Sequence, residues 1–181
     1  MIVDKLKLIF IHIPKCGGSS ATFYFKDLLR GVVKQEPDWN WGINTHNEVN
    51  GETWKHKTIH FFKENYPKEY KEYRKIVFIR EPTMRLISYY CWINKGKMFL
   101  ERDFLNWIYT FKPKSMASFI DDTCELTTIE LFNEDCMPHL NYNDRDRVVL
   151  ISNPTLKILE RLYAEDYRLF KLINKIDLKI Y

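Results

Sequence analysis

The sequence predicts an α/β domain with a mostly parallel sheet. Patterns typical of strands alternate with patterns typical of helices along the 181-residue chain, and a helix between two strands usually joins parallel neighbours. A second observation is that the first of these strands runs into a glycine loop that opens a helix. The hydrophobic content of 45% is enough for one sizeable core, so we expect a single domain over residues 1–181.

The opening unit is a strand, a glycine loop and a helix. Residues 6–13 (LKLIFIHI) are rich in β-branched and aromatic side chains and end at Pro14, which cannot continue a strand ladder. We expect this strand to be both the first and the central one. The sequence KCGGSS follows at residues 15–20, and residues 21–30 carry apolar side chains at helical spacing.

A second strand and helix follow further along. Residues 74–80 (RKIVFIR) have the pattern of a buried strand, which ends at Glu81 and Pro82. Residues 83–96 then predict a helix, because a proline suits the first helical turn.

The other patterns are less regular. Residues 31–52 predict an irregular segment, either the border of a substrate cleft or a plain surface loop, and residues 55–65 fit a short strand or the start of a helix. Further elements are expected as a helix at 103–111, strands at 127–132 and 147–151 (RVVLI), and one or two closing helices over 154–180.

Composition excludes several classes of protein. A net charge of +4 with 29% charged residues fits neither a long acidic tail nor a histone-like protein, and we expect no nucleic-acid partner. The four cysteines form no CxxC pair, so we expect reduced thiols and no zinc site. No apolar run is long enough for a membrane span and residues 1–7 are charged, so we expect a cytoplasmic protein.

The glycine loop has the chemistry of a phosphate cradle. Backbone N–H groups at a helix start point outward, and the helix dipole favours an anion there. The residues of this candidate site are Lys15, Cys16, Gly17, Gly18, Ser19 and Ser20. In the alternative interpretation, the glycines serve only tight packing between strand and helix. The loop is not a Walker A motif, because its lysine precedes both glycines, and this disfavours ATP-dependent kinases.

A second anion site is predicted where the strand at residues 74–80 ends. Arg80 supplies a guanidinium there, and Ser88 lies two turns into the following helix, so both could reach one phosphate. In the alternative interpretation, Arg80 and Arg85 pair with nearby acids such as Glu81, and Ser88 has no special role.

Together the two segments resemble the PAPS-dependent sulfotransferases, in particular the carbohydrate-type branch with the heparan and chondroitin sulfotransferases and many bacterial relatives. In that branch a P-K-x-G-[GS]-[ST]-S-like loop binds the 5′-phosphosulfate of 3′-phosphoadenosine-5′-phosphosulfate (PAPS), and an R-[DN]-P-x-x-R-x-x-S-x-Y-like segment binds its 3′-phosphate. Here the two segments are PKCGGSS and REPTMRLISYY, with Glu81 in place of the usual Asp or Asn. The resemblance implies a three-layer, P-loop-like fold with a central, mostly parallel sheet flanked by helices.

The resemblance also implies roles for single residues. Lys15 and the amides of residues 16–20 would hold the phosphosulfate, and Arg80 and Ser88 the 3′-phosphate. The segment KHKTI at residues 55–59 is similar to a K-H-A-T-A-like segment of bacterial members, which makes His56 the base, with His60 and His46 as competitors. A segment at residues 162–170 (LYAEDYRLF) is similar to the closing helix of the branch and is expected to be structural.

The function that follows is transfer of a sulfuryl group from PAPS to a hydroxyl, with a carbohydrate-like acceptor, in-line geometry and a histidine base. No metal is implied, because protein donors meet the charge of the leaving adenosine 3′,5′-bisphosphate. Three alternatives stay open: an atypical P-loop kinase, a non-catalytic nucleotide-binding module, and a protein that grips a sulfated polymer through Lys55, Lys57, Lys112 and Lys114. The sequence gives neither the acceptor nor the oligomeric state.

Overall fold

The computed structural model describes residues 1–21, 24–25, 56–128, 149 and 151–177. The chain divides into two compact units, each made of two stretches of sequence. Unit 1 comprises Met1–Ile79 and Ser118–Leu140, and unit 2 comprises Arg80–Ala117 and Asn141–Tyr181. The single domain expected from the sequence stays a prediction.

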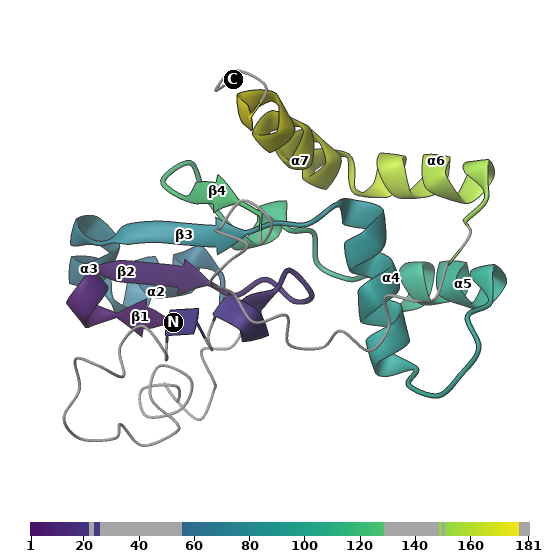
Figure 1. Cartoon of the computed structure of the whole chain (residues 1–181), viewed down its shortest axis with the longest axis horizontal. Coiled ribbons are helices and arrows are strands. Elements are labelled where there is room, and N and C mark those ends of the chain that lie inside the picture. The colour runs from purple at the N-terminus through teal and green to yellow at the C-terminus, as the bar shows by residue number, and fades with distance from the viewer. Residues whose placement is uncertain (22–23, 26–55, 129–148, 150, 178–181) are drawn as a thin grey trace. The chain divides into compact units, whose positions relative to one another are not determined.

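Unit 1 is built on a four-stranded sheet in the order β1-β2-β3-β4 (Figure 1). Strand β1 (Ile2–Val3) pairs antiparallel with β2 (Leu8–Ile11), whereas β3 (Arg74–Phe78) pairs parallel with both β2 and β4 (Glu125–Thr127). All four residues of β2 are buried, as their apolar run predicts. The mixed α/β architecture and the mostly parallel sheet are therefore confirmed.

The prediction that the strand over residues 6–13 is the first one was wrong. The short strand β1 precedes it, and a 3-10 turn (Asp4–Leu6) joins the two strands. Lys7 ends that turn in the left-handed region, with φ 47°. Two residues are too few to give a recognisable alternation of polar and apolar side chains, which is why the sequence pattern missed β1.

The register of the parallel strands places their carboxyl ends at one edge of the sheet. Leu8 pairs with Arg74 and Ile11 with Val77, while Phe78 pairs with Thr127. The loop that follows β2 therefore leaves the sheet at the edge where β3 and β4 also end. In open α/β sheets this is the edge that binds ligands.

Two short helices of unit 1 lie behind the sheet in the view of Figure 1. They are α2 (Ile59–Asn65) and α3 (Pro67–Glu72). The apolar face of α2 buries Ile59 and Phe62, which are three residues apart. The ambiguous segment over residues 55–65 is thus helical from Ile59 onward.

Unit 2 is helical in the part of the chain that the structure describes. Its helices are α4 (Pro82–Ile93), α5 (Glu101–Phe111), α6 (Asn153–Leu162) and α7 (Ala164–Asp177), all in predicted regions. Their core contains seven buried residues: Leu86, Ile87, Tyr90, Phe104, Ile108, Leu159 and Tyr163. None of the described helices is long and apolar enough to cross a membrane.

Two strand predictions need correction or lie partly outside the described residues. The strand expected at residues 127–132 is β4, which ends at Thr127, and residues 129–132 are not described. Of the strand expected at residues 147–151, only Val149 and Ile151 are described, and neither is in a strand. Both pack against the apolar core of unit 2, so their hydrophobic pattern serves helix packing instead.

Candidate functional site

The loop after β2 turns tightly and leads into a helical segment. The Cys16 amide donates to the Ile13 carbonyl at 3.3 Å, and the Ala21 amide donates to the Gly17 carbonyl at 3.0 Å. Residues 18–21 are helical, so the amides of the first turn precede the helical ladder and point toward the loop. The loop and helix start expected from the sequence are therefore present, and an anion site there stays a prediction.

The side chains of the loop differ in their exposure. Ser19 is exposed and Lys15 is partly exposed, whereas Cys16 and Ser20 are buried. Lys15 has a φ of 67°, in the left-handed region that costs a non-glycine residue about 1–2 kcal/mol. Strained backbone of this kind is concentrated at functional sites, so it is consistent with a site at Lys15.

The two glycines of the loop are required for different reasons. Gly17 has a φ of 83°, a conformation that glycine adopts without strain. At Gly18 a Cβ atom would lie only 1.9 Å from Cδ2 and 2.0 Å from Nε2 of His12. Internal geometry therefore explains both glycines, and their presence alone does not indicate a ligand.

His56 lies in unit 1, next to this loop. Its Nδ1 is 2.9 Å from the backbone carbonyl oxygen of His12, and the two imidazole rings are 4.5 Å apart between centroids. A carbonyl oxygen can only accept a hydrogen bond, so Nδ1 of His56 must carry the proton. In the neutral ring, the lone pair then lies on Nε2, which is the nitrogen able to take a proton.

The three histidines considered from the sequence have different positions. His56 is partly buried beside the loop and has a φ of 66°, while His60 is exposed on α2. His46 lies outside the described residues. A fourth histidine, His12, belongs to none of the motifs in the sequence, yet its ring contacts both Gly18 and His56. His12 directly follows β2, and no local pattern in the sequence indicated its contact with His56.

The arginine segment begins unit 2. Arg80 is partly exposed and directly precedes the N-cap residue of α4, and Ser88 is partly exposed within that helix. The carboxylate of Glu81 accepts hydrogen bonds from the amides of Thr83 and Met84, at 3.1 Å and 2.7 Å. Glu81 thus caps α4, so the residue that departs from the family pattern has a structural role in this chain.

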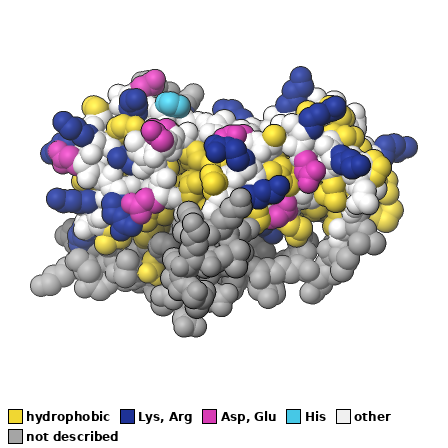
Figure 2. Space-filling view, turned by 90° about the horizontal axis from the view of Figure 1, so that it is seen from above, with side chains coloured by type: hydrophobic (Ala, Val, Ile, Leu, Met, Phe, Trp, Pro, Cys, Tyr) yellow, Lys and Arg dark blue, Asp and Glu magenta, His cyan; other side chains and the backbone are white. Residues whose placement is uncertain are grey.

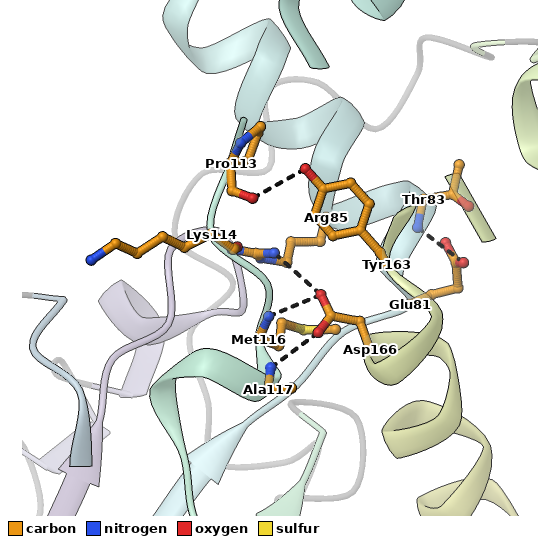
Figure 3. Close-up of polar contacts among 9 residues, drawn as sticks. All are labelled: Glu81, Thr83, Arg85, Pro113, Lys114, Met116, Ala117, Tyr163 and Asp166. Carbon is orange, nitrogen blue, oxygen red and sulfur yellow. Dashed lines mark hydrogen bonds and ion pairs between the residues drawn. The ribbon is translucent and has the colours of Figure 1, made fainter. Parts of the chain in front are cut away.

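Arg85 belongs to the interior of unit 2. Its guanidinium Nη1 is 3.6 Å from Oδ2 of Asp166 on α7, and its Nη2 donates to the Lys114 carbonyl at 2.9 Å. The same carboxylate accepts hydrogen bonds from the amides of Met116 (2.9 Å) and Ala117 (3.0 Å), as Figure 3 shows. Arg85 thus pairs with an acid, as the alternative interpretation held, and that acid is Asp166.

The environment of Asp166 combines a cost with several stabilising contacts. Burial raises the pKa of the Asp166 carboxyl, while hydrogen bonds from Ala117 and Met116 and the charge of Arg85 oppose this shift. A buried charge that lost such partners would be strongly unfavourable. The network therefore fixes α7, the segment before the 3-10 turn η2 (Ala117–Phe119) and α4 to one another.

Two tyrosines extend this network. The hydroxyl of Tyr163 donates to the Pro113 carbonyl at 3.1 Å, and burial raises the pKa of Tyr163 to about 12. The hydroxyl of Tyr167 is 2.7 Å from the hydroxyl of Thr83 on α4. Tyr163, Asp166 and Tyr167 are the residues of the closing segment at 162–170 that make these contacts, and all of the contacts lie within unit 2.

Surface charge shows no strong bias on the face that Figure 2 draws. Lys and Arg side chains are interspersed with Asp and Glu side chains there. Of the lysines considered for polymer binding, Lys57 packs over the Phe61 ring at 5.1 Å and Lys112 and Lys114 are exposed. Lys55 lies outside the described residues. Within the described ranges, no group of three or more His, Cys, Asp or Glu residues is placed to hold a metal ion.

Comparison with known proteins gives one match. A family model described as the sulfotransferase family matches residues 1–117. This stretch includes the Lys15 loop, His56, Arg80 and Ser88, and it ends before β4, α6 and α7. No curated protein and no solved structure matches the chain.

Proposed function

The chain belongs to the sulfotransferase family, and on that premise we propose that it transfers the sulfuryl group of PAPS to a hydroxyl of a carbohydrate-like acceptor. The observation that carries this proposal is the position of His56 beside the Lys15 loop. Its Nδ1 hydrogen-bonds to the His12 carbonyl, which leaves Nε2 to accept a proton.

The donor's 5′-phosphosulfate is assigned to the Lys15 loop. The amides at the start of the helical segment and the exposed hydroxyl of Ser19 are donors of the type that phosphate and sulfate oxygens accept. Lys15 adds a point charge that would stabilise negative charge on the transferred group. The chemistry of these donors fits the donor molecule, which supplies the sulfuryl group and the leaving bisphosphate.

The 3′-phosphate is assigned to Arg80 and Ser88. Support comes from the topology, because the loop after β2 and the chain after β3 follow adjacent parallel strands whose carboxyl ends share one sheet edge. Such an arrangement is typical of P-loop-like folds, and we propose the three-layer variety for this chain.

The role of His56 is that of general base. The acceptor oxygen forms a bond to sulfur as the bond from sulfur to the phosphate oxygen breaks, and the hydroxyl proton passes to Nε2 of His56. Lys15 and the loop amides stabilise the charge that develops on the sulfuryl oxygens and on the departing phosphate.

Calorimetry tests the nucleotide assignment before any acceptor is known. We expect adenosine 3′,5′-bisphosphate to bind more tightly than AMP by about 1.5–3 kcal/mol, because AMP lacks the phosphate assigned to Arg80. Arg80→Ala should weaken binding of the bisphosphate by a similar amount and hardly change that of AMP. The control is Arg102→Ala, which alters an exposed arginine of unit 2.

Two outcomes would contradict the proposal. Equal affinity of the parent protein for AMP and the bisphosphate would remove the 3′-phosphate site. A rise in melting temperature with magnesium-ATP, but not with the bisphosphate, would instead favour the kinase interpretation.

A further inference from the structure

The ring of His12 is packed between the glycine loop and the candidate base. On one side it lies against Gly18, so closely that a Cβ atom added there would be 2.6 Å from Cγ and nearer still to Cδ2 and Nε2. The same ring lies 4.5 Å from the His56 ring between centroids, at an interplanar angle of 59°. These three residues all belong to unit 1.

His56 is held by two contacts with the same residue. The carbonyl of His12 accepts a hydrogen bond from Nδ1, and the ring of His12 packs against the imidazole in a tilted arrangement. The backbone of His56 is left-handed, with φ 66°, which surrounding contacts must maintain because the conformation is unfavourable for a non-glycine residue. The two contacts thus restrict both the tautomer and the orientation of the ring.

From this arrangement we infer that His12 is a positioning residue for the base and couples its orientation to the phosphosulfate loop. The inference rests on the proposed role of His56. The ring of His12 acts by packing rather than by exchanging protons. It holds the His56 ring in the orientation that points Nε2 at the acceptor hydroxyl, and Gly18 keeps the His12 ring in place. A misdirected base loses rate because proton transfer depends on alignment.

Three variants test the role of the His12 ring. His12→Ala removes the ring but keeps the carbonyl, and His12→Phe keeps a ring without nitrogen atoms. His60→Ala is the control, because His60 is an exposed histidine of the same unit. The readouts are PAPS turnover with the most active member of a panel of saccharide acceptors, calorimetry with adenosine 3′,5′-bisphosphate, and two-bond ¹H–¹⁵N NMR spectra of the imidazole nitrogens.

We expect His12→Ala to lower turnover by on the order of 10- to 100-fold while bisphosphate affinity stays within about threefold of the parent value. The NMR spectrum of His56 should change from a single Nδ1–H form to a mixture of tautomers. His12→Phe should retain the turnover and the single tautomer, and His60→Ala should match the parent in all three readouts.

A double-mutant cycle tests the packing independently of turnover. Gly18→Ala should lower the melting temperature and disturb the His56 tautomer in the parent, because its methyl group collides with the His12 ring. In the His12→Ala background the same substitution should have little further effect on either readout.

Several results would overturn the inference. Parental turnover and tautomer in His12→Ala would show that the ring positions nothing, and so would equal effects of Gly18→Ala in both backgrounds. Lost turnover in His12→Phe with an unchanged His56 tautomer would show that a His12 nitrogen itself takes part in the chemistry. If the proposed function fails, the parent protein does not bind the bisphosphate, yet the NMR spectra and the cycle still decide whether His12 orients His56.

Discussion

The carboxylate of Asp166 on α7 lies 3.6 Å from the guanidinium of Arg85 on α4, and each side chain is only 1% exposed. The same carboxylate accepts hydrogen bonds from the backbone amides of Met116, which precedes η2, and of Ala117, the first residue of η2. One acidic residue near the end of the chain thus completes the interior of unit 2. The second arginine of the REPTMR segment is committed to this interior contact.

Asp166→Asn should strongly destabilise the protein. The substitution leaves the Arg85 charge buried without its carboxylate, which typically costs about 3–5 kcal/mol. Urea unfolding followed by circular dichroism measures the change. The matched control is Arg168→Ala, which breaks the exposed pair with Glu165 on the same helix and should cost less than about 1 kcal/mol. Equal effects of the two substitutions would contradict the role assigned to Asp166.

The stability of the protein should fall at alkaline pH, partly through Tyr163. Burial raises its pKa from 10 to about 12, so the folded state favours the neutral phenol. The stabilisation is complete below pH 10 and is lost as pH rises through the folded pKa, by up to about 2.7 kcal/mol. Tyr163→Phe should be less stable than the parent at pH 8 by about 1–2 kcal/mol, because the Pro113 carbonyl loses its donor.

The difference between these two proteins should shrink above pH 10, because Tyr163→Phe has no phenol to ionise. Unfolding free energies at pH 8, 10 and 11 provide the comparison. A difference that stays constant over this range would mean that Tyr163 ionises as readily in the folded protein as in the unfolded one.

Lys15→Ala should separate function from stability. The lysine is partly exposed and its ammonium is assigned to the phosphosulfate, so the unfolding free energy should change by less than about 0.5 kcal/mol while PAPS turnover is lost. Lys15→Gly should lose turnover equally but be more stable than Lys15→Ala, since glycine adopts the left-handed backbone without strain. Failure of Lys15→Ala to fold would assign the lysine a structural role.

His56→Ala should slow transfer by at least ~100-fold while binding the bisphosphate like the parent, because a general base contributes to rate and little to donor affinity. His60→Ala should have a much smaller effect on the rate. Turnover and calorimetry on the same preparations separate the two quantities. If His60→Ala proves the more damaging of the two, the base has been assigned to the wrong histidine.

The predictable elements are those with a continuous or periodic buried face. Strand β3 and helices α4 and α5 bury such faces, so the spacing of their apolar residues predicted them. Helix α3 buries no residue at all, which explains why no periodic pattern indicated it.

The residues of the candidate site also differ in whether a local sequence pattern indicates them. A glycine pair after a buried strand indicated the Lys15 loop from local sequence alone. The contact between His56 and His12 joins residues 44 positions apart, and the bond from Met116 to Asp166 joins residues 50 apart. Such pairs depend on how the elements pack, which no local pattern encodes, so His12 and the partner of Arg85 could not be predicted from the sequence.

The interleaving of the two units has a consequence for synthesis on the ribosome. Each unit consists of two separate stretches, and the second stretch of unit 2 begins only after unit 1 has been completed in sequence. Arg85 therefore emerges from the ribosome long before Asp166, whose carboxylate pairs with it. The amide of Ala117 also lacks its hydrogen-bond acceptor until Asp166 has been synthesised. A nascent chain stalled before α7 would expose an unfinished apolar surface, and such intermediates are the species that aggregate or recruit chaperones.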